Sequence, residues 1–180
     1  EKIMEIEGAL GADIIMAFDE CTPATADHAY AQVAMERTHR WLLQCIKKHQ
    51  QLQSKNKINH KKPQALFPII QGGIYDDLRI QSTQFCAKTD LPGIAIGGLS
   101  VGEERATMYH ILETIYPHLP EHKPRYLMGV GTPKDILEAV ERGIDMFDCI
   151  MPGQLAQRGV AFTSQGKLQL RRSVYKFSEV

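Results

Sequence analysis

The fold is decided by the stretch Gly93–Glu103, which reads GIAIGGLSVGE. Its first seven residues are nearly all apolar over about the length of one strand, a pattern typical of a strand buried on both faces. Ser100 and Glu103 have the spacing of a capping box, which predicts a helix over residues 103–117. The stretch therefore indicates a buried strand that turns directly into a helix.

The same alternation repeats on both sides of this stretch. Further apolar runs cover residues 13–19, 65–71, 125–130 and 145–151, and helical spacing predicts helices over residues 27–50, 75–88 and 134–141. Thr132 and Pro133 supply a capping hydroxyl and a first-turn proline for the last of these helices, and Gly143 ends it. Strands and helices that alternate through short links predict an α/β fold with a parallel sheet.

Two architectures fit this alternation, an open doubly wound sheet and a (β/α)8 TIM barrel. Asp19, Gln71, Gly97-Gly98 and Asp148 lie at or near the downstream end of an apolar run. In a barrel these ends meet at one mouth, where active sites form. No G-x-G-x-x-G follows the first run, which disfavours the nucleotide-binding alternative. We predict a barrel that is present only in part, because five runs are visible where eight are needed, with an antiparallel hairpin over residues 160–172.

Composition excludes several classes of protein. The 180 residues are 43% apolar and 23% charged, with 21 acidic and 21 basic side chains, which fits a globular chain and argues against nucleic-acid binding by bulk charge alone. Without a basic-then-apolar leader or an apolar run near 20 residues, we expect a cytoplasmic protein with no membrane partner. The four cysteines form no C-x-x-C pair, so no metal or other cofactor is expected within this chain.

The two ends and one internal stretch add expectations about organisation. The chain begins at Glu1 without a methionine, so we expect residues 1–180 to be the central and C-terminal part of one catalytic barrel domain. Residues 47–62 carry six lysines and no acid, which predicts a solvated, flexible connection.

Asp148 and Asp19 are the first candidates for chemistry, because a carboxylate in an apolar run is costly unless it is paired or used. Two carboxylates at one pocket suit retaining glycosyl transfer, with one as nucleophile. They could also hold a divalent metal, although no further ligand has a clear spacing. The amide of Gln71 suits the edge of a heterocyclic base, and Gly98 allows close backbone approach. Residues 129–133 offer N–H groups to an anion.

Five short motifs then occur in order: FDECTP at 18–23, IQGG at 70–73, IGGLSVGE at 96–103, YLMGVG at 126–131 and DMFDC at 145–149. Together they resemble the tRNA-guanine transglycosylases, also called queuine tRNA-ribosyltransferases, through nearly the whole chain. The resemblance implies a barrel enzyme of queuosine biosynthesis that exchanges guanine at the anticodon wobble position of tRNA for a 7-deazaguanine. Cys21 and Val101 resemble the bacterial type, which inserts 7-aminomethyl-7-deazaguanine.

The resemblance also implies residue roles. Asp148 matches the nucleophile, Asp19, Gln71 and Gly98 match the residues that grip the base, and Cys21, Leu99 and Met128 match the pocket lining. It further implies a homodimer, a general acid/base upstream of this chain and a zinc site beyond Val180. The positions that match RNA-contacting segments are Gly129, Val130, Gly131, Thr132, Pro133, Lys134 and Asp135, and then Gly153, Gln154, Leu155, Ala156 and Gln157.

The second RNA-contacting segment departs from the family pattern. The family usually has Thr-Arg followed by a second Arg three residues later, whereas this loop has Gly153-Gln154 and Gln157. Losing two cations weakens attraction to phosphates. Two alternatives stay open: a non-catalytic accessory subunit of the same fold, which has no need for Asp148, and an unrelated barrel enzyme acting on a sugar phosphate, which explains the strand-end residues but not the ordered motifs.

Overall fold

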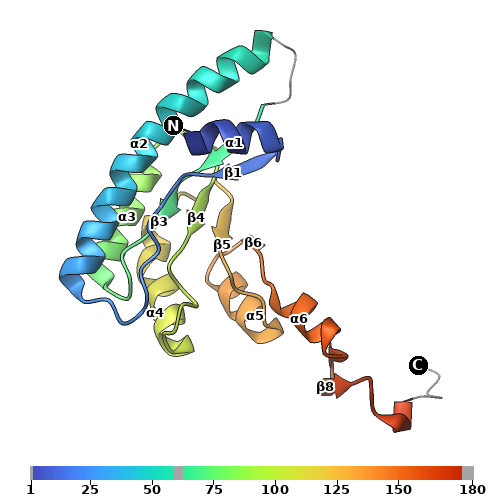
Figure 1. The fold of residues 1–180 in the computed structure, drawn as a ribbon. Helices are drawn as coiled ribbons and strands as arrows, with labels where there is room; N and C mark the ends of the chain where they lie inside the picture. The colour runs from blue at the N-terminus through green and yellow to red at the C-terminus, as the bar shows by residue number, and fades with distance from the viewer. Residues whose placement is uncertain (1, 59–62, 176–180) are drawn as a thin grey trace.

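The computed structural model describes residues 2–58 and 63–175 as a parallel sheet covered by helices, with a hairpin near the C-terminus (Figure 1). All five apolar runs form strands, as predicted. In chain order the elements are α1 (Lys2–Leu10), β1 (Ile14–Met16), α2 (His28–Ile58), β2 (Ala65–Phe67), β3 (Ile69–Ile70), α3 (Asp76–Ala87), β4 (Ile94–Ile96), α4 (Arg105–Ile115), a 3-10 turn (Tyr116–His118), β5 (Arg125–Leu127), α5 (Pro133–Glu141), β6 (Met146–Phe147), α6 (Met151–Gln157), β7 (Val160–Thr163), β8 (Gly166–Gln169) and a second 3-10 turn (Ser173–Tyr175).

The strands from β1 to β6 pair in parallel and in sequence order. β1 pairs with β2, and β3, β4, β5 and β6 form a four-stranded sheet. Pro68, which has no N–H to donate, separates β2 from β3 within one apolar run. Its carbonyl still accepts a 2.9 Å hydrogen bond from the amide of Ala95. The run over residues 65–71 therefore pairs with β1 on one side and β4 on the other, which joins the two sheets into one wall.

Helices cover one face of this wall. Ile15, Leu66, Ile96 and Leu127 alternate along the strands and pack with residues of α1 to α5 in the main core. The intervening strand residues form a second cluster that contains no helix residue: Phe67, Ile69 and Ala95, with Met16, Ala65, Tyr126, Met128 and Met146 against them. We call the face that carries this second cluster the inner face. Burial on both faces explains the near-continuous apolar runs, and sequential parallel strands with helices on one side are typical of a barrel wall.

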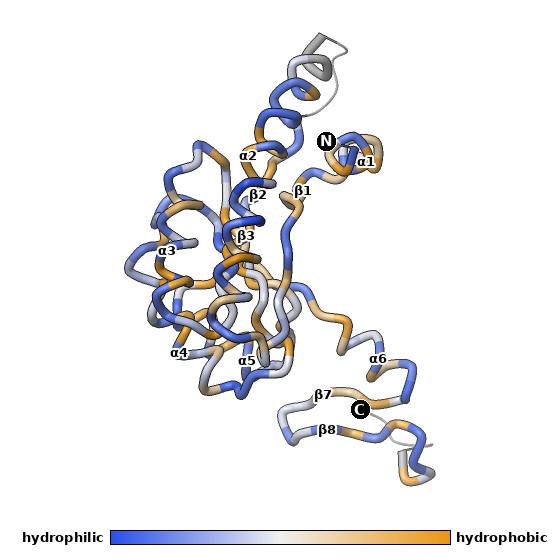
Figure 2. The backbone as a smooth tube through the Cα atoms, turned by 60° about the vertical axis from the view of Figure 1, so that its left-hand side comes forward, coloured by the Kyte–Doolittle hydropathy of each residue, from blue (hydrophilic) through white to orange (hydrophobic). Residues whose placement is uncertain are grey.

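The ends of α5 and the hairpin confirm the local predictions. The Thr132 hydroxyl accepts a hydrogen bond from the amide of Asp135 at 3.2 Å, Pro133 opens the helix, and Gly143 follows its end at a φ of 81°. β7 and β8 pair antiparallel through the turn between Thr163 and Gly166. The hairpin projects away from the helix-covered wall in two views (Figures 1 and 2).

Two local predictions are wrong. The stretch predicted as a flexible connection continues α2 as far as Ile58, because it contains no glycine or proline and is rich in lysine and glutamine, which favour helix; residues 59–62 lie outside the described part. The helix after the capping box begins at Arg105 rather than at residue 103. Glu103 still accepts hydrogen bonds from the amides of Ser100 and Val101, but Ser100 has a φ of 60°, which the first residue of a helix does not adopt.

In residues 2–58 and 63–175, no helix is both long and apolar enough to cross a membrane.

Candidate active site

The predicted site residues gather where the parallel strands end. Gln71 directly follows β3 and Gly97 directly follows β4, whereas Asp148 directly follows β6. Because strand side chains alternate, Gln71 continues the inner-face position of Ile69, and Asp148 continues that of Met146. Both side chains therefore leave the wall on its inner face at the carboxyl edge, the edge where barrel enzymes build their sites.

Asp19 and Gln71 contact each other directly, although 52 residues separate them. The amide Nε2 of Gln71 donates a 2.7 Å hydrogen bond to Oδ2 of Asp19. Burial raises the pKa of the Asp19 carboxyl, and the hydrogen bond from Gln71 opposes that rise. Gln71 is only 1% exposed, and its carbonyl oxygen Oε1 has no hydrogen-bond partner among the described residues. A buried acceptor without a donor is costly, so this amide is prepared for a ligand that brings an N–H group.

Two glycines make room for that amide. A Cβ at residue 97 would lie 2.7 Å from Nε2 of Gln71, and a Cβ at residue 98 would lie 2.3 Å from its Oε1. Gly98 also has a φ of 64°, which favours glycine. The Gly98 amide contacts the thiol of Cys21, whose pKa is raised by burial and then by the Asp19 carboxylate. The structure thus brings Asp19, Gln71, Gly98 and Cys21 into one contiguous group.

Asp148 lies farther along the same edge and is exposed. Its Oδ1 accepts two 2.7 Å hydrogen bonds, one from the hydroxyl of Tyr126 and one from the amide of Gly129. Burial, followed by the contact with Asp148, raises the pKa of Tyr126, so this hydroxyl stays a donor. None of the described basic side chains forms an ion pair with Asp148. The carboxylate is therefore oriented through one oxygen, while Oδ2 has no protein donor in the described part of the chain.

The two remaining pocket residues lie on opposite faces. Leu99 is 3% exposed and packs in the main core beneath the helices. Met128 is half-buried and packs on the inner face with Tyr126. Of these two residues, Met128 shares the inner face with Gln71 and Asp148. The side chain of Leu99 packs on the opposite, helix-covered face of the sheet.

The first segment expected to contact RNA opens α5 and borders a cavity of about 210 Å³. Residues 129–132, Arg105 and Cys149 help to line this cavity, and Lys134 is exposed beside it. Asp135 is instead buried: its Oδ1 accepts a 2.7 Å hydrogen bond from the Tyr109 hydroxyl and lies 3.1 Å from Nε of Arg105. The segment therefore presents backbone N–H groups and Lys134, while the Asp135 side chain fastens it.

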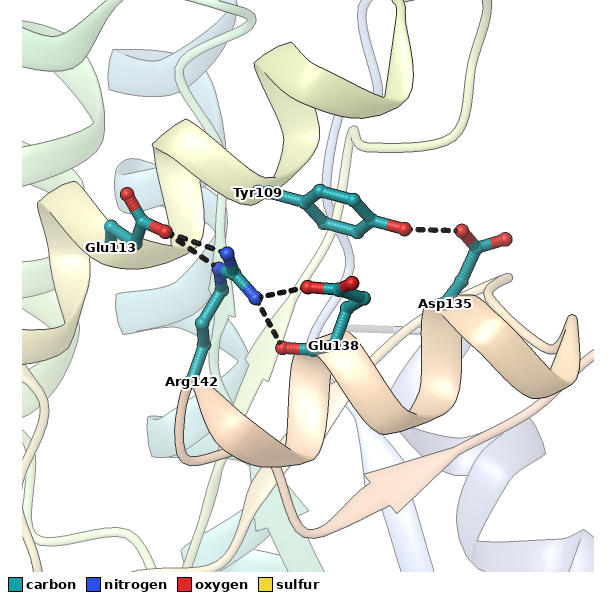
Figure 3. Close-up of polar contacts among 5 residues, drawn as sticks. All are labelled: Tyr109, Glu113, Asp135, Glu138 and Arg142. Carbon is teal, nitrogen blue, oxygen red and sulfur yellow. Dashed lines mark hydrogen bonds and ion pairs between the residues drawn. The ribbon is translucent and has the colours of Figure 1, made fainter.

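Figure 3 shows how that fastening continues between α4 and α5. Tyr109 and Glu113 extend from α4 toward Asp135 and Glu138 of α5 and toward Arg142, which directly follows α5. Arg142 lies 2.7 Å from Glu113 and 2.8 Å from Glu138. Burial, and then the hydrogen bond to Asp135, raises the pKa of Tyr109 to about 12, so the phenol stays protonated. The bond from Tyr109 to Asp135 fixes the start of α5, and the ion pairs of Arg142 fix its end.

The second segment expected to contact RNA is a helix and not a loop. Residues 153–157 lie in α6, which Pro152 opens, and Gly153, Gln154, Ala156 and Gln157 are exposed whereas Leu155 is half-buried. Proline is favoured in the first turn of a helix, and this signal was available in the sequence. The segment therefore presents uncharged side chains at the surface, next to the exposed Arg158.

Sequence reasoning missed two residues that hold the site. One is Tyr126, which holds Asp148. The other is Arg79, whose side chain is fully buried against the carbonyl groups of Gly73, Gly97 and Gly98. A signal for Arg79 exists, because residues 79, 82, 83 and 86 lie at helical spacing and form the buried stripe of α3.

The described residues contain no group of three or more metal-ligating side chains. The groups gathered at this edge are carboxylates, an amide and backbone N–H groups. Fold and site together define a parallel α/β protein whose candidate site lies at the carboxyl ends of its strands, as in barrel enzymes.

Comparison with known proteins specifies the class further. Residues 1–179 match the family model described as queuine tRNA-ribosyltransferase. The chain is 53% identical over 175 residues to the queuine tRNA-ribosyltransferase of Herpetosiphon aurantiacus, which covers 97% of this chain and 42% of the relative. Identity is 51% to that of Halothermothrix orenii and 47% to that of Bacillus subtilis, each over 98% of this chain and 44% of the relative. The chain belongs to the queuine tRNA-ribosyltransferase family and spans less than half the length of these relatives.

Proposed function

We propose that the full-length protein exchanges guanine at the wobble position of tRNA for a 7-deazaguanine, through a covalent bond between ribose and Asp148. In this proposal the chain contributes part of the wall of a (β/α)8 barrel, and its partners are the anticodon loop and the free base. The bacterial pattern at Cys21 and Val101 favours 7-aminomethyl-7-deazaguanine over queuine as the incoming base.

One observation carries the proposal: Asp148 is an exposed carboxylate at a strand end, held through Oδ1 alone by two neutral donors. A nucleophilic carboxylate needs one oxygen fixed and the other available for attack. A carboxylate used only for structure would instead pair with a basic group or bury both oxygens. An accessory subunit would have no use for this arrangement.

The reaction then has two displacements at one carbon. Oδ2 of Asp148 attacks C1′ of the ribose, and the bond from C1′ to guanine N9 breaks with its electron pair leaving on the base, which takes up a proton. The incoming base loses its N9 proton and attacks C1′, and the ester bond to Asp148 breaks. Two inversions retain the configuration of the sugar. Tyr126 and Gly129 stabilise the carboxylate before attack and after its release.

Base recognition follows from the group around Gln71. A guanine-like ring edge offers two neighbouring N–H donors and one carbonyl acceptor. In this proposal the unpartnered Oε1 of Gln71 and the carboxylate of Asp19 accept from such donors. The amide of Gly98, which contacts the Cys21 thiol in the structure, donates to the carbonyl of the base. Because the same edge occurs on guanine and on 7-deazaguanines, one site serves the leaving and the incoming base.

The test is an exchange assay with labelled guanine on the full-length protein. Asp148→Asn should lower the rate about 1,000-fold or more, because an amide oxygen is a poor nucleophile, and should abolish the tRNA–protein adduct seen on a denaturing gel. Asp145→Asn is the matched control: Asp145 lies on the same segment but accepts a 2.8 Å hydrogen bond from the Arg125 amide at the opposite end of β5. Normal turnover by Asp148→Asn would exclude the nucleophile, and wild-type protein without adduct or turnover would favour the accessory subunit.

The homodimer, a general acid/base upstream of this chain and a zinc site beyond Val180 stay predictions of the family resemblance.

A further inference from the structure

We infer that Arg79 is a positioning residue for base recognition, an inference that rests on the proposed function. Arg79 comes from α3 and is fully buried. Its guanidinium lies beneath the carboxyl ends of β3 and β4, the two strands that carry Gln71 and Gly98 into the site.

The guanidinium joins two backbone segments, residues 70–73 at the end of β3 and residues 97–98 after β4. Its Nε donates to the carbonyl of Gly73 at 2.7 Å, beyond the end of β3. One terminal nitrogen donates to Gly97 at 2.7 Å and to Ile70 at 3.3 Å, and the other donates to Gly98 at 2.8 Å. Four of its five N–H groups are therefore directed at strand-end carbonyls. A planar guanidinium can do this because its donors are fixed in a fork.

Burying the Arg79 guanidinium costs desolvation free energy, which indicates that its hydrogen bonds serve a purpose. Burial lowers the pKa of Arg79 to about 10, which leaves the side chain charged at neutral pH. None of the described carboxylates forms an ion pair with it, so its charge is balanced by carbonyl dipoles, with Glu103 the acid that favours the charged form most. An apolar residue would avoid the desolvation of a buried charge but could not bind carbonyls of two strands together.

The geometry of the base site depends on those carbonyls. A Cβ on Gly98 would lie 2.3 Å from Oε1 of Gln71, so the glycine backbone and the amide already approach as closely as they can. On the same stripe of α3, Ser82 accepts a 3.1 Å hydrogen bond from the amide of Gln71. Helix α3 thus holds the backbone of Gln71 through Ser82, and it holds the spacing between Gln71 and Gly98 through Arg79. Without the guanidinium, the recognition edge would have to be ordered by the base itself.

Arg125 provides a matched comparison, because it is a second buried arginine that binds backbone carbonyls. It is 7% exposed and donates to Leu119, Pro120 and Gly143, all at the amino-terminal end of the strands. Lysine at either position keeps the charge but loses the fork of donors. Both variants should lower the melting temperature, and only Arg79→Lys should disturb the base site.

The experiment compares Arg79→Lys and Arg125→Lys in the full-length protein, by calorimetric titration with 7-aminomethyl-7-deazaguanine and by the Michaelis constants for base and tRNA. We expect Arg79→Lys to weaken base binding at least 10-fold with the constant for tRNA unchanged within twofold, and Arg125→Lys to leave base binding unchanged. An equal loss in both variants, or no loss in Arg79→Lys, would overturn the inference. Wild-type protein that fails to bind the base would instead refute the proposed function.

If Arg79→Lys does not fold, amide hydrogen exchange on the wild-type protein still tests whether the recognition edge is ordered before the base binds. The amide of Gly97 donates to the carbonyl of Ile70 at 3.1 Å, next to the guanidinium. If Arg79 preforms the edge, this amide and that of Gln71 exchange slowly before any base is added. Fast exchange that slows only with base would show that the base orders the edge, and would overturn the inference.

Discussion

Replacing Gly98 by alanine tests the recognition edge most directly. Gly98 has a φ of 64°, and a Cβ there would lie 2.3 Å from Oε1 of Gln71 and 3.3 Å from a terminal nitrogen of Arg79. Heavy atoms do not approach to 2.3 Å without bonding, so the amide must move by about 1 Å to regain ordinary contact. Gln71 is 1% exposed and cannot turn toward solvent, so the movement breaks its 2.7 Å hydrogen bond to Asp19.

The cost can be divided into two parts. The left-handed backbone costs alanine about 1–2 kcal/mol relative to glycine. The displaced amide loses its hydrogen bond to Asp19, which adds roughly 1 kcal/mol. Gly11 isolates the first part, because it has a φ of 76° and a Cβ there would meet nothing within 4 Å. We therefore expect Gly98→Ala to lower the free energy of unfolding by about 2–3 kcal/mol and Gly11→Ala by about 1–2 kcal/mol.

Base affinity separates the two variants more sharply than stability. Calorimetric titration of the full-length protein with the free 7-deazaguanine should show at least a 10-fold loss for Gly98→Ala, because two contacts to the base move with the amide, each worth about 1 kcal/mol. Gly11→Ala should bind as the wild type does. If Gly98→Ala unfolds like Gly11→Ala and binds the base normally, then Gln71 is not held against residue 98 and this account of the edge is wrong.

Two further predictions concern titrating groups of the full-length protein. Because burial raises the pKa of Asp19, the folded state holds that proton more tightly than the unfolded state, and the carboxylate lowers stability above that pKa. Asp19→Asn should therefore melt at or above the wild-type temperature at pH 7 while binding the base at least 10-fold more weakly; a lower melting temperature or wild-type affinity contradicts this. His39 is 8% exposed and burial lowers its pKa to about 4, so its stabilisation is complete above pH 6.5 and is lost as the pH falls toward 4. In urea titrations, the wild type should lose roughly 2 kcal/mol more than His39→Gln between pH 7 and pH 4.5, and equal losses would contradict the assignment.

Part of this candidate site could be predicted from the sequence, because the strand period and the position of a polar residue at the end of an apolar run determine where its side chain lies. A strand alternates its side chains, so an apolar run that ends in a polar residue places that residue at the carboxyl edge of a parallel sheet. Gln71 and Asp148 are such residues, and the hydrogen bond from Gln71 to Asp19 shows that the segments following β3 and β1 come together. Thr132 and Gly143 were predictable for a similar reason, since the ends of helices have local signals.

The residues that hold the site were harder to find, because their roles depend on contacts between distant segments. Arg79 lies on helix α3, and charged residues of folded proteins are usually exposed. Only the packing of α3 on the sheet shows that its guanidinium binds backbone carbonyls. Tyr126 looks like an ordinary aromatic strand residue until β6 places Asp148 beside it. Helix α2 was underestimated because runs of lysine indicate exposure but do not distinguish a helix from a loop.

The proposed nucleophile Asp148 and the first segment proposed to contact RNA are directly connected. The amide of Gly129 donates to Asp148, and Gly129 is also the first residue of that segment. Three residues on, Thr132 caps α5 together with Asp135, which Tyr109 ties to α4. The backbone that would meet an RNA phosphate in the proposed function is therefore continuous with the N–H donor that orients Asp148. In the proposed function the base is recognised by residues that follow β1, β3 and β4, whereas Asp148 follows β6 and is held by Tyr126 of β5 and by Gly129. The binding of the base and the orientation of the nucleophile therefore depend on different strands.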